Sequence, residues 1–164
     1  MNIQIEIKIL DARLREWGLP KHQTEQSAGI DLHACVEEPL LLLPQAAAVL
    51  IPTGFAMHMN SNGLCALIVP RSGLGHKKGL VMGNGTGVID ADYTAQCYIS
   101  AWNRHSSGEP ILINPGDRIA QMLFIPILRP VFDIVDSFSA ASRRGDGGFG
   151  STGLVASKPN DRHG

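Results

Sequence analysis

The segment 87–93 places two carboxylates beside an aromatic hydroxyl. It reads Gly-Val-Ile-Asp-Ala-Asp-Tyr, so Asp90 and Asp92 occupy alternate positions and Tyr93 follows them. In a strand both carboxylates would face the same side, where like charges favour a turn or a shared cation. One of them could hold a water that attacks phosphorus, and because an aspartate is a weak base, orientation would be its main contribution. An Asx-type turn that opens a hairpin fits the same residues.

The segment 70–75 carries groups that bind phosphate. It reads Pro-Arg-Ser-Gly-Leu-Gly and combines the guanidinium of Arg71, the hydroxyl of Ser72 and backbone N–H groups at the predicted start of a helix. Helix N-termini and charge-assisted hydrogen bonds hold phosphate groups in many proteins. The order of residues that defines a P-loop is absent. Hairpin turns are the alternative explanation for the glycines in and around this segment.

Two more segments combine polar groups with glycine. Residues 116–121 read Gly-Asp-Arg-Ile-Ala-Gln before an apolar strand, and we expect Gln121 on the same face as Ile119 and Leu123, either as a core amide or as a ligand contact. Residues 145–153 contain five glycines, preceded by Arg144 and interrupted by Phe149. This last segment fits either a frayed tail or a flap that closes over a planar, anionic ligand.

Many short strands must position these segments. Gly and Pro total 28 of 164 residues and bound a series of apolar runs, which favours short antiparallel strands over a helical bundle. The pattern predicts an all-β, jelly-roll-like barrel or sandwich with one or two short helices, over Leu10–Trp17 and Ser72–Lys78. The predicted strands are Ile3–Ile9, Ile30–Ala34, Leu40–Leu43, Ala48–Ile51, Phe55–Met59, Leu64–Val69, Gln96–Trp102, Pro110–Ile113, Ile119–Ile125 and Val131–Val135.

Composition excludes several classes of function. The formal net charge of −1 argues against nucleic acid as a partner, and no apolar run is long enough to span a membrane. The alternation at the N-terminus is typical of a strand and not of a signal peptide. Cys35, Cys65 and Cys97 are odd in number and lack metal-ligand spacing, so we expect reduced, buried thiols in a cytoplasmic protein.

Taken together, five segments resemble the motifs of the trimeric deoxyuridine triphosphatase (dUTPase) family, in the family's order. The resemblance extends from about Ile3 to Gly153 and implies a β jelly roll over residues 1–143, followed by a flexible flap and tail over 144–164. It also implies a homotrimer whose copies share each active site. The matching segments are Ala28–Leu32, Pro70–Gly75, Gly83–Tyr93, Gly116–Gln121 and Arg144–Gly153.

The resemblance implies hydrolysis of dUTP to dUMP and pyrophosphate. Asp90 would position the water that attacks the α-phosphorus, and Asp31 would engage Mg²⁺ through water, with the triphosphate oxygens holding most of the metal. The implied phosphate contacts are Arg71, Ser72, Gly73, Gln121 and Arg144. The implied contacts to uracil and deoxyribose are Asn84, Val88, Ile89, Tyr93, Tyr98 and Phe149.

One residue departs from the family's pattern, and two alternative functions fit the same fold. Ala95 stands where many members of the family have glycine, which would cost roughly 1 kcal/mol or more if the position needs a positive φ. A dCTP deaminase shares the fold and would release ammonia instead of pyrophosphate. A non-catalytic nucleotide-binding regulator would bind dUTP without turnover.

Overall fold

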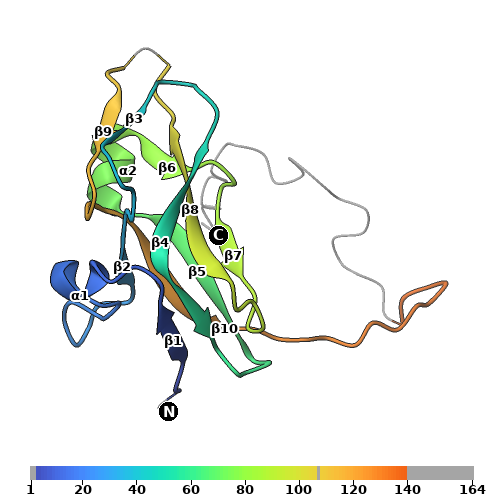
Figure 1. Cartoon of the computed structure of the whole chain (residues 1–164). Helices are drawn as coiled ribbons and strands as arrows, with labels where there is room; N and C mark the ends of the chain where they lie inside the picture. The colour runs from blue at the N-terminus through green and yellow to red at the C-terminus, as the bar shows by residue number, and fades with distance from the viewer. Residues whose placement is uncertain (1–2, 107, 140–164) are drawn as a thin grey trace, which may run out of the picture. The chain divides into compact units, whose positions relative to one another are not determined.

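The computed structural model describes residues 3–106 and 108–139, which consist mainly of short β-strands (Figure 1). Contacts divide the chain into two units, Met1–Arg129 and Pro130–Gly164. The predicted boundary between residues 143 and 144 lies outside the described residues. The elements of the described chain are β1 (Glu6–Ile9), α1 (Leu14–Trp17), β2 (Ile30–His33), β3 (Leu40–Leu42), β4 (Val49–His58), β5 (Leu64–Pro70), α2 (Ser72–Lys78), β6 (Leu80–Met82), β7 (Gly87–Ile89), β8 (Gln96–Asn103), β9 (Ile111–Ile113) and β10 (Arg118–Pro126).

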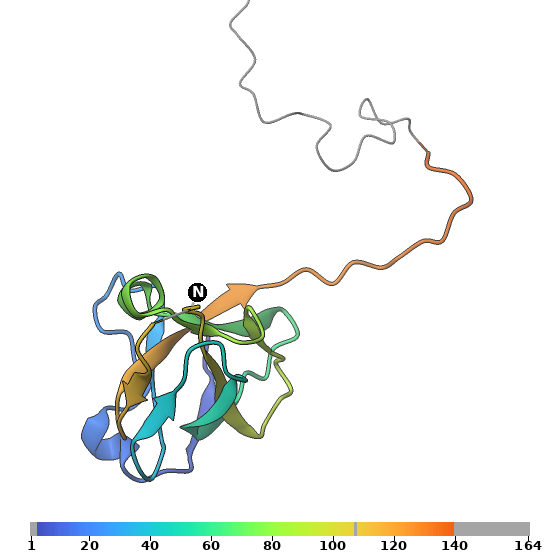
Figure 2. The ribbon, with the colours of Figure 1, turned by 90° about the horizontal axis from the view of Figure 1, so that it is seen from above.

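Three antiparallel sheets build the first unit. Two have four strands each, in the orders β1-β4-β8-β6 and β2-β10-β5-β7, and the third pairs β3 with β9. Seen from above, the strands surround a common interior (Figure 2). The prediction of an all-β fold with one or two short helices is confirmed.

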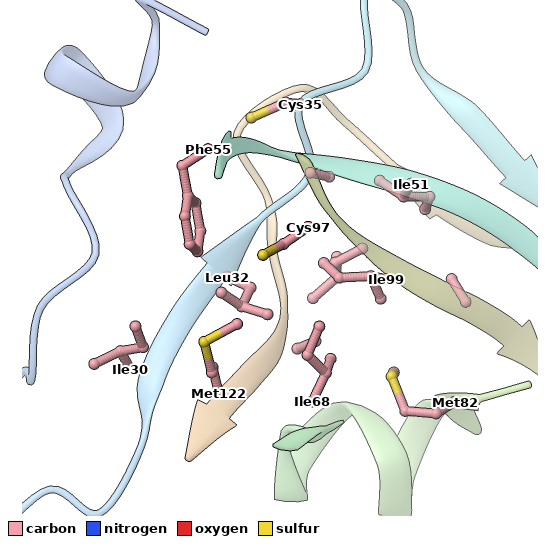
Figure 3. Packing of buried hydrophobic residues seen from close by; sticks show 14 of the residues in the cluster. Ile30, Leu32, Cys35, Ile51, Phe55, Ile68, Met82, Cys97, Ile99 and Met122 are labelled. Atoms are coloured by element: carbon pink, nitrogen blue, oxygen red, sulfur yellow. The ribbon is translucent and has the colours of Figure 1, made fainter. Parts of the chain in front are cut away.

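The core lies between the two four-stranded sheets. Leu32, Ile68 and Met122 from one sheet meet Ile51 and Ile99 from the other, each at most 1% exposed (Figure 3). Because side chains alternate along a strand, burying these residues turns their neighbours outward. The outward face of the β2-β10-β5-β7 sheet therefore carries Asp31 and Gln121 beside apolar residues such as Leu67, Val69 and Leu123.

The three cysteines are free and buried, as the sequence predicted. Burial raises the pKa of Cys35 to about 12 and that of Cys97 to about 11. Both thiols are therefore protonated at neutral pH and poor nucleophiles.

One long strand replaces two predicted ones. The sequence predicted strands over Ala48–Ile51 and Phe55–Met59, but β4 is continuous and its pairing with β8 shifts between Pro52 and Ala56. Gly54 lies inside this irregularity with a φ of 76°. Bulges accommodate both a proline without an N–H and a glycine with a positive φ, so these residues bend the strand without ending it.

The predicted helix over Leu10–Trp17 is shorter than expected. The backbone N–H groups of Leu10 and Asp11 both donate to the carbonyl oxygen of Gly54, at 2.8 and 2.9 Å, which ties this stretch to β4 in a non-helical path. Only α1 remains helical. A tertiary contact has therefore overridden the local periodicity.

Further differences concern short or unpaired segments. β6 and β7 have three residues each and were not predicted. Residues 131–135 form neither strand nor helix, so the prediction there was wrong. An apolar run does not fix a strand by itself, because a strand also needs a hydrogen-bonded neighbour.

Within residues 3–106 and 108–139, no helix has the length and apolar character needed to cross a membrane.

We predict that Gly54→Ala destabilises the fold. A Cβ there would lie 2.5 Å from Sγ of Cys35 and 2.9 Å from Cβ of Asp11, in a backbone conformation that disfavours side chains. The free energy of unfolding should fall by at least about 2 kcal/mol. Urea unfolding at fixed protein concentration measures it, with Gly63→Ala as the control because its nearest neighbour is 3.9 Å away. Equal stability of the two variants would contradict the prediction.

Candidate active site

A carboxylate on β2 lies between two arginine side chains. Nε of Arg71 is 3.0 Å from Oδ1 of Asp31, and Nη1 of Arg118 donates to Oδ2 at 2.9 Å. Nη1 of Arg71 also donates to the backbone carbonyl oxygen of Arg118 at 2.9 Å. The side chain of Asp31 is 12% exposed, whereas those of Arg71 and Arg118 are 33% and 46% exposed. Two positive charges and one negative charge leave a local excess that attracts an anion.

Strand register adds an amide to this site. Gln121 on β10 pairs with Asp31 on β2 and with Val69 on β5, so the three residues form one row across the sheet. Nε2 of Gln121 donates to the carbonyl oxygen of Pro70 at 3.0 Å. A Cβ at Gly29 would lie 2.8 Å from Oε1 of Gln121, so glycine is needed for this close approach. We call Asp31, Arg71, Arg118 and Gln121 the arginine cluster.

A β-bulge changes the side-chain order along β10. Arg118 pairs with His33, but the next pair involves Ala120, which leaves Ile119 as an extra residue. Ile119 and Ala120 are both buried, although a regular strand would bury only one of them. The sequence placed Gln121 on the face of Ile119, and the bulge makes that prediction wrong: Ile119 lies in the core while Gln121 is half-buried.

A tight turn fixes the start of β10. The N–H of Gly116 donates to the carbonyl oxygen of Ala34 at 2.9 Å. The N–H of Ala34 in turn donates to the carbonyl oxygen of Asp117 at 2.8 Å. Gly116 has a φ of 84°, and a Cβ there would lie 2.9 Å from the ring of Trp17. The turn is thereby anchored to the end of β2, and it holds the arginine that follows it.

The helix predicted over Ser72–Lys78 has these same bounds in the structure, as α2. Arg71 precedes it in an extended conformation and ends the path of β5. Ser72 and Gly73 are exposed at its first turn. Together with Lys77 and Lys78 they line a hollow of about 260 Å³ beside Arg71. The hydroxyl and the N–H groups predicted to bind phosphate therefore lie next to the arginine cluster.

A second group of predicted residues lies on β7, β8 and the loops beside them. The hydroxyl of Tyr93 donates to the carbonyl oxygen of Gln96 at 2.9 Å, and Nε2 of Gln96 donates to the hydroxyl oxygen of Tyr98 at 3.1 Å. Asn84 and Val88 are exposed, and both tyrosines keep about two fifths of their surface open. We call residues 83–98 the tyrosine hairpin.

The loop that carries Asn84 packs closely against β8. The N–H of Gly83 donates to the carbonyl oxygen of Ser100 at 2.8 Å. A Cβ at Gly83 would collide with the Cβ of Ala48, so only glycine fits. This close approach fixes the backbone directly before Asn84 against β8.

Asp90 is exposed in the turn after β7. Its backbone carbonyl oxygen accepts a hydrogen bond from the N–H of Tyr93 at 3.2 Å, and within the described residues its carboxylate has no hydrogen-bond partner. Ala95 is not among the described residues with a positive φ. Alanine therefore costs nothing in backbone strain at this position.

The arginine cluster and Asp90 lie toward opposite ends of β5. Ile89 pairs with Ala66, and Asp90 follows it, whereas Arg71 comes directly after the other end of the strand. Five residues of an extended strand separate Ala66 from Arg71, which corresponds to about 16 Å. One copy of the chain therefore does not bring the two groups together.

Two predicted contacts, Arg144 and Phe149, lie outside the described residues. The structure brings Asp31, Arg71 and Gln121 together, with Ser72 and Gly73 beside them. It groups Asn84, Val88, Ile89, Tyr93 and Tyr98 separately, with Asp90.

The described residues offer no protein-only metal cage. They contain no group of three or more His, Cys, Asp or Glu side chains that could hold an ion. Each oxygen of Asp31 already faces a guanidinium, but a carboxylate oxygen has a second lone pair. Asp31 therefore fits a metal bound through water better than direct coordination, and other ligands must come from a bound anion.

Sequence reasoning gave Arg118 no role. It lies in the quoted segment 116–121, but strict alternation places it on the face opposite Gln121, together with Ala120 and Met122. The bulge that reverses this parity depends on pairing with β2. Burial lowers the pKa of the neighbouring His33, so its ring is neutral at pH 7 and adds no charge to the cluster.

Comparison with known proteins gives one consistent result. The dUTPase family model matches residues 15–153. A deoxyuridine 5'-triphosphate nucleotidohydrolase of Tolumonas auensis is 52% identical over 151 residues, covering 92% of this chain and 97% of the relative. One of Xanthomonas oryzae pv. oryzae is 53% identical over 151 residues, covering 92% and 95%.

Solved structures agree with these relatives. A variant of the Staphylococcus bacteriophage 80alpha dUTPase with dUpNHpp has a TM-score of 0.76 and 28% identity, covering 92% of this chain and 99% of that one. A variant of the dUTPase from phage phi11 of S. aureus, described with a structural Mg(II) ion, has a TM-score of 0.71 and 25% identity, covering 84% and 99%.

We predict that Gly29→Ala displaces the side chain of Gln121. The new methyl group would lie 2.8 Å from Oε1, so the amide must rotate away and lose its bond to Pro70. The loss should cost about 1 kcal/mol of folding stability. A crystal structure of the variant and its unfolding curve measure both effects, with Gly63→Ala as the control. An unmoved Gln121 amide would contradict the prediction.

Proposed function

The chain belongs to the dUTPase family, and we propose that it hydrolyses dUTP to dUMP and pyrophosphate at a site completed by a second copy of the chain. The observation that carries this proposal is the separation of the arginine cluster from Asp90 along β5. Each group has the chemistry for one part of the nucleotide, and neither suffices alone.

The arginine cluster would bind the triphosphate. Nε and Nη1 of Arg71 already have partners, which leaves Nη2 for a phosphate oxygen. Ser72 and Gly73 would add a hydroxyl and an N–H at the start of α2, and Gln121 has a second amide hydrogen besides the one given to Pro70. These donors would be fixed before the substrate arrives, which lowers the entropic cost of binding.

Asp90 would hold the attacking water. Its carboxylate accepts a proton as the water oxygen forms a bond to the α-phosphorus. The bond between that phosphorus and the bridging oxygen breaks, and pyrophosphate leaves with the electron pair. The described chain gives Asp90 an exposed place in a turn, so orientation relative to a substrate bound by another copy supplies most of its effect.

We propose Mg²⁺ as the cofactor, held mainly by triphosphate oxygens and through water by Asp31. Bound magnesium would neutralise the phosphate charge that develops during the reaction. The second lone pairs on the oxygens of Asp31 support this assignment, because the arginines leave them free.

The tyrosine hairpin would bind the nucleoside. Asn84 and the backbone groups of Val88, Ile89 and Tyr98 would pair with the uracil edge. Cytosine would present a donor where uracil presents an acceptor, and losing a matched hydrogen bond is costly. Tyr93 is fixed by its bond to Gln96 and would exclude a ribose 2'-hydroxyl by contact with the sugar.

We propose a homotrimer in which Arg144 and Phe149 of a further copy close over the phosphates and the uracil. Exposed apolar side chains support an assembly: Leu128, Val131, Phe132 and Ile134 are each at least 84% exposed. Apolar residues exposed in a series mark protein interfaces. The three free thiols agree with a cytoplasmic location.

We predict that Asp90→Asn strongly reduces turnover of dUTP while sparing nucleotide binding. An amide cannot take the proton, so kcat should fall by on the order of a thousandfold. A pyrophosphate-release assay with dUTP measures turnover, and calorimetry with the imido analogue dUpNHpp measures binding. Near-normal kcat would remove Asp90 from the reaction, and lost analogue binding would show a structural role.

We also predict that two inactive variants restore activity when mixed. In a cyclic trimer whose sites take Arg71 from one copy and Asp90 from the next, every mixed trimer has one intact site. Random mixing of Arg71→Gln and Asp90→Asn subunits in equal amounts should therefore give about a quarter of wild-type activity. The subunits are mixed by joint refolding, and each variant refolded alone is the control. Without recovery, the site would lie within one copy.

A further inference from the structure

We infer that Arg118 is a positioning residue that keeps the phosphate-binding edge of Arg71 open. It does so by holding one oxygen of Asp31, which would otherwise close over that edge. The inference rests on the proposed function in one respect, namely that Nη2 of Arg71 meets a phosphate oxygen.

The contacts around Asp31 divide its carboxylate between two partners. Oδ1 faces Nε of Arg71 at 3.0 Å, and Oδ2 accepts from Nη1 of Arg118 at 2.9 Å. An arginine and a carboxylate prefer a paired geometry in which Nε and Nη2 meet the two oxygens side by side. Nη2 of Arg71 makes no hydrogen bond to Asp31, and the bond from Arg118 to Oδ2 accounts for this. Nη2 of Arg71 is thereby left without a protein partner among the described residues.

The backbone of Arg118 completes the arrangement. Its carbonyl oxygen accepts from Nη1 of Arg71 at 2.9 Å, so the guanidinium is held on two edges. Rotation of Arg71 is therefore opposed from one side by Asp31 and from the other by the main chain of β10.

A bulge in β10 and the turn before this strand place Arg118 beside Asp31. The bulge at Ile119 turns Arg118 to the outer face, where Asp31 and Gln121 lie. The turn before it is anchored by the two hydrogen bonds with Ala34 and by the packing of Gly116 on Trp17. A bulge that re-aims a single side chain beside a functional group is a recurrent device in β-sheets.

The charge balance around Asp31 supports the same inference about Arg118. Without Arg118, the carboxylate of Asp31 would have only Arg71 as a partner and would neutralise the one guanidinium that the phosphate needs. With Arg118 present, the cluster keeps its positive excess next to Nη2. Arg118 thus acts through Asp31 on the strength of Arg71 as a phosphate ligand.

The test is a double-mutant cycle with dUpNHpp binding measured by calorimetry. Arg118→Gln should weaken the binding of dUpNHpp by about tenfold. Asp31, no longer held by Arg118, would pair with Nη2 of Arg71 and compete with the phosphate oxygen for it. Arg118→Lys should restore most of the affinity, since a lysine can still hold Oδ2. In an Arg71→Gln background, Arg118→Gln should have almost no further effect, because coupled residues are not additive. Arg15→Gln is the matched control, because Arg15 is exposed and has no ion pair within the described residues.

A second measurement needs no nucleotide. A crystal structure of full-length Arg118→Gln should show both oxygens of Asp31 on Nε and Nη2 of Arg71. An unchanged Asp31 in that structure overturns the inference, as does a full tenfold loss in the Arg71→Gln background, which would make Arg118 an independent phosphate ligand. Turnover of dUTP by the wild-type chain tests the proposed function separately, so its failure leaves the structural result on Asp31 and Arg71 standing.

Discussion

The carboxylate of Asp31, shared between Arg71 and Arg118, is the interaction on which the phosphate side of the molecule depends. Two guanidinium groups repel each other unless a negative charge lies between them. A carboxylate that is 12% exposed is itself costly unless it is paired. Each of these three charged groups therefore lowers the electrostatic cost of placing the other two at the sheet surface. The same balance leaves a positive excess, which a triphosphate can neutralise.

That interaction requires three strands to be in exact register. Asp31, Gln121 and Val69 form one row across β2, β10 and β5, and a shift of one residue in β2 or β10 would move Asp31 or Gln121 into the core. The buried layer on the other side, which includes Leu32, Ile68 and Met122, prevents such a shift. The core thus acts on function through register, without touching the substrate.

Much of the fold follows from local sequence, and the exceptions share one cause. Helix Ser72–Lys78 was predicted to the residue from Ser72 at its start, and the structure shows that Gly79, in the left-handed conformation, ends it. Strands with clear alternation were predicted as well. The continuous path of β4 through Pro52 and the bulge at Ile119 were not, because both depend on pairing with strands far away in the sequence. The types of the candidate site residues were readable from motifs, but their division into two groups depends on the pairing of β5 with β7, a strand that local patterns did not reveal.

Dividing the site between two groups has a consequence for specificity. In the proposed site, the arginine cluster by itself would recognise only negative charge and would accept any polyphosphate. The tyrosine hairpin by itself would bind a base and a sugar, and its carboxylate would have no phosphorus to act on. Because the register of β5 with β7 separates Arg71 from Asp90 by about 16 Å along the strand within one copy, the proposed site would need a neighbouring copy to supply the other group. Assembly would then raise the effective concentration of the second group at the first. Under this proposal, selection of the nucleotide and hydrolysis of its triphosphate would be properties of the assembly, and each chain would need only to hold its own half of the site rigid.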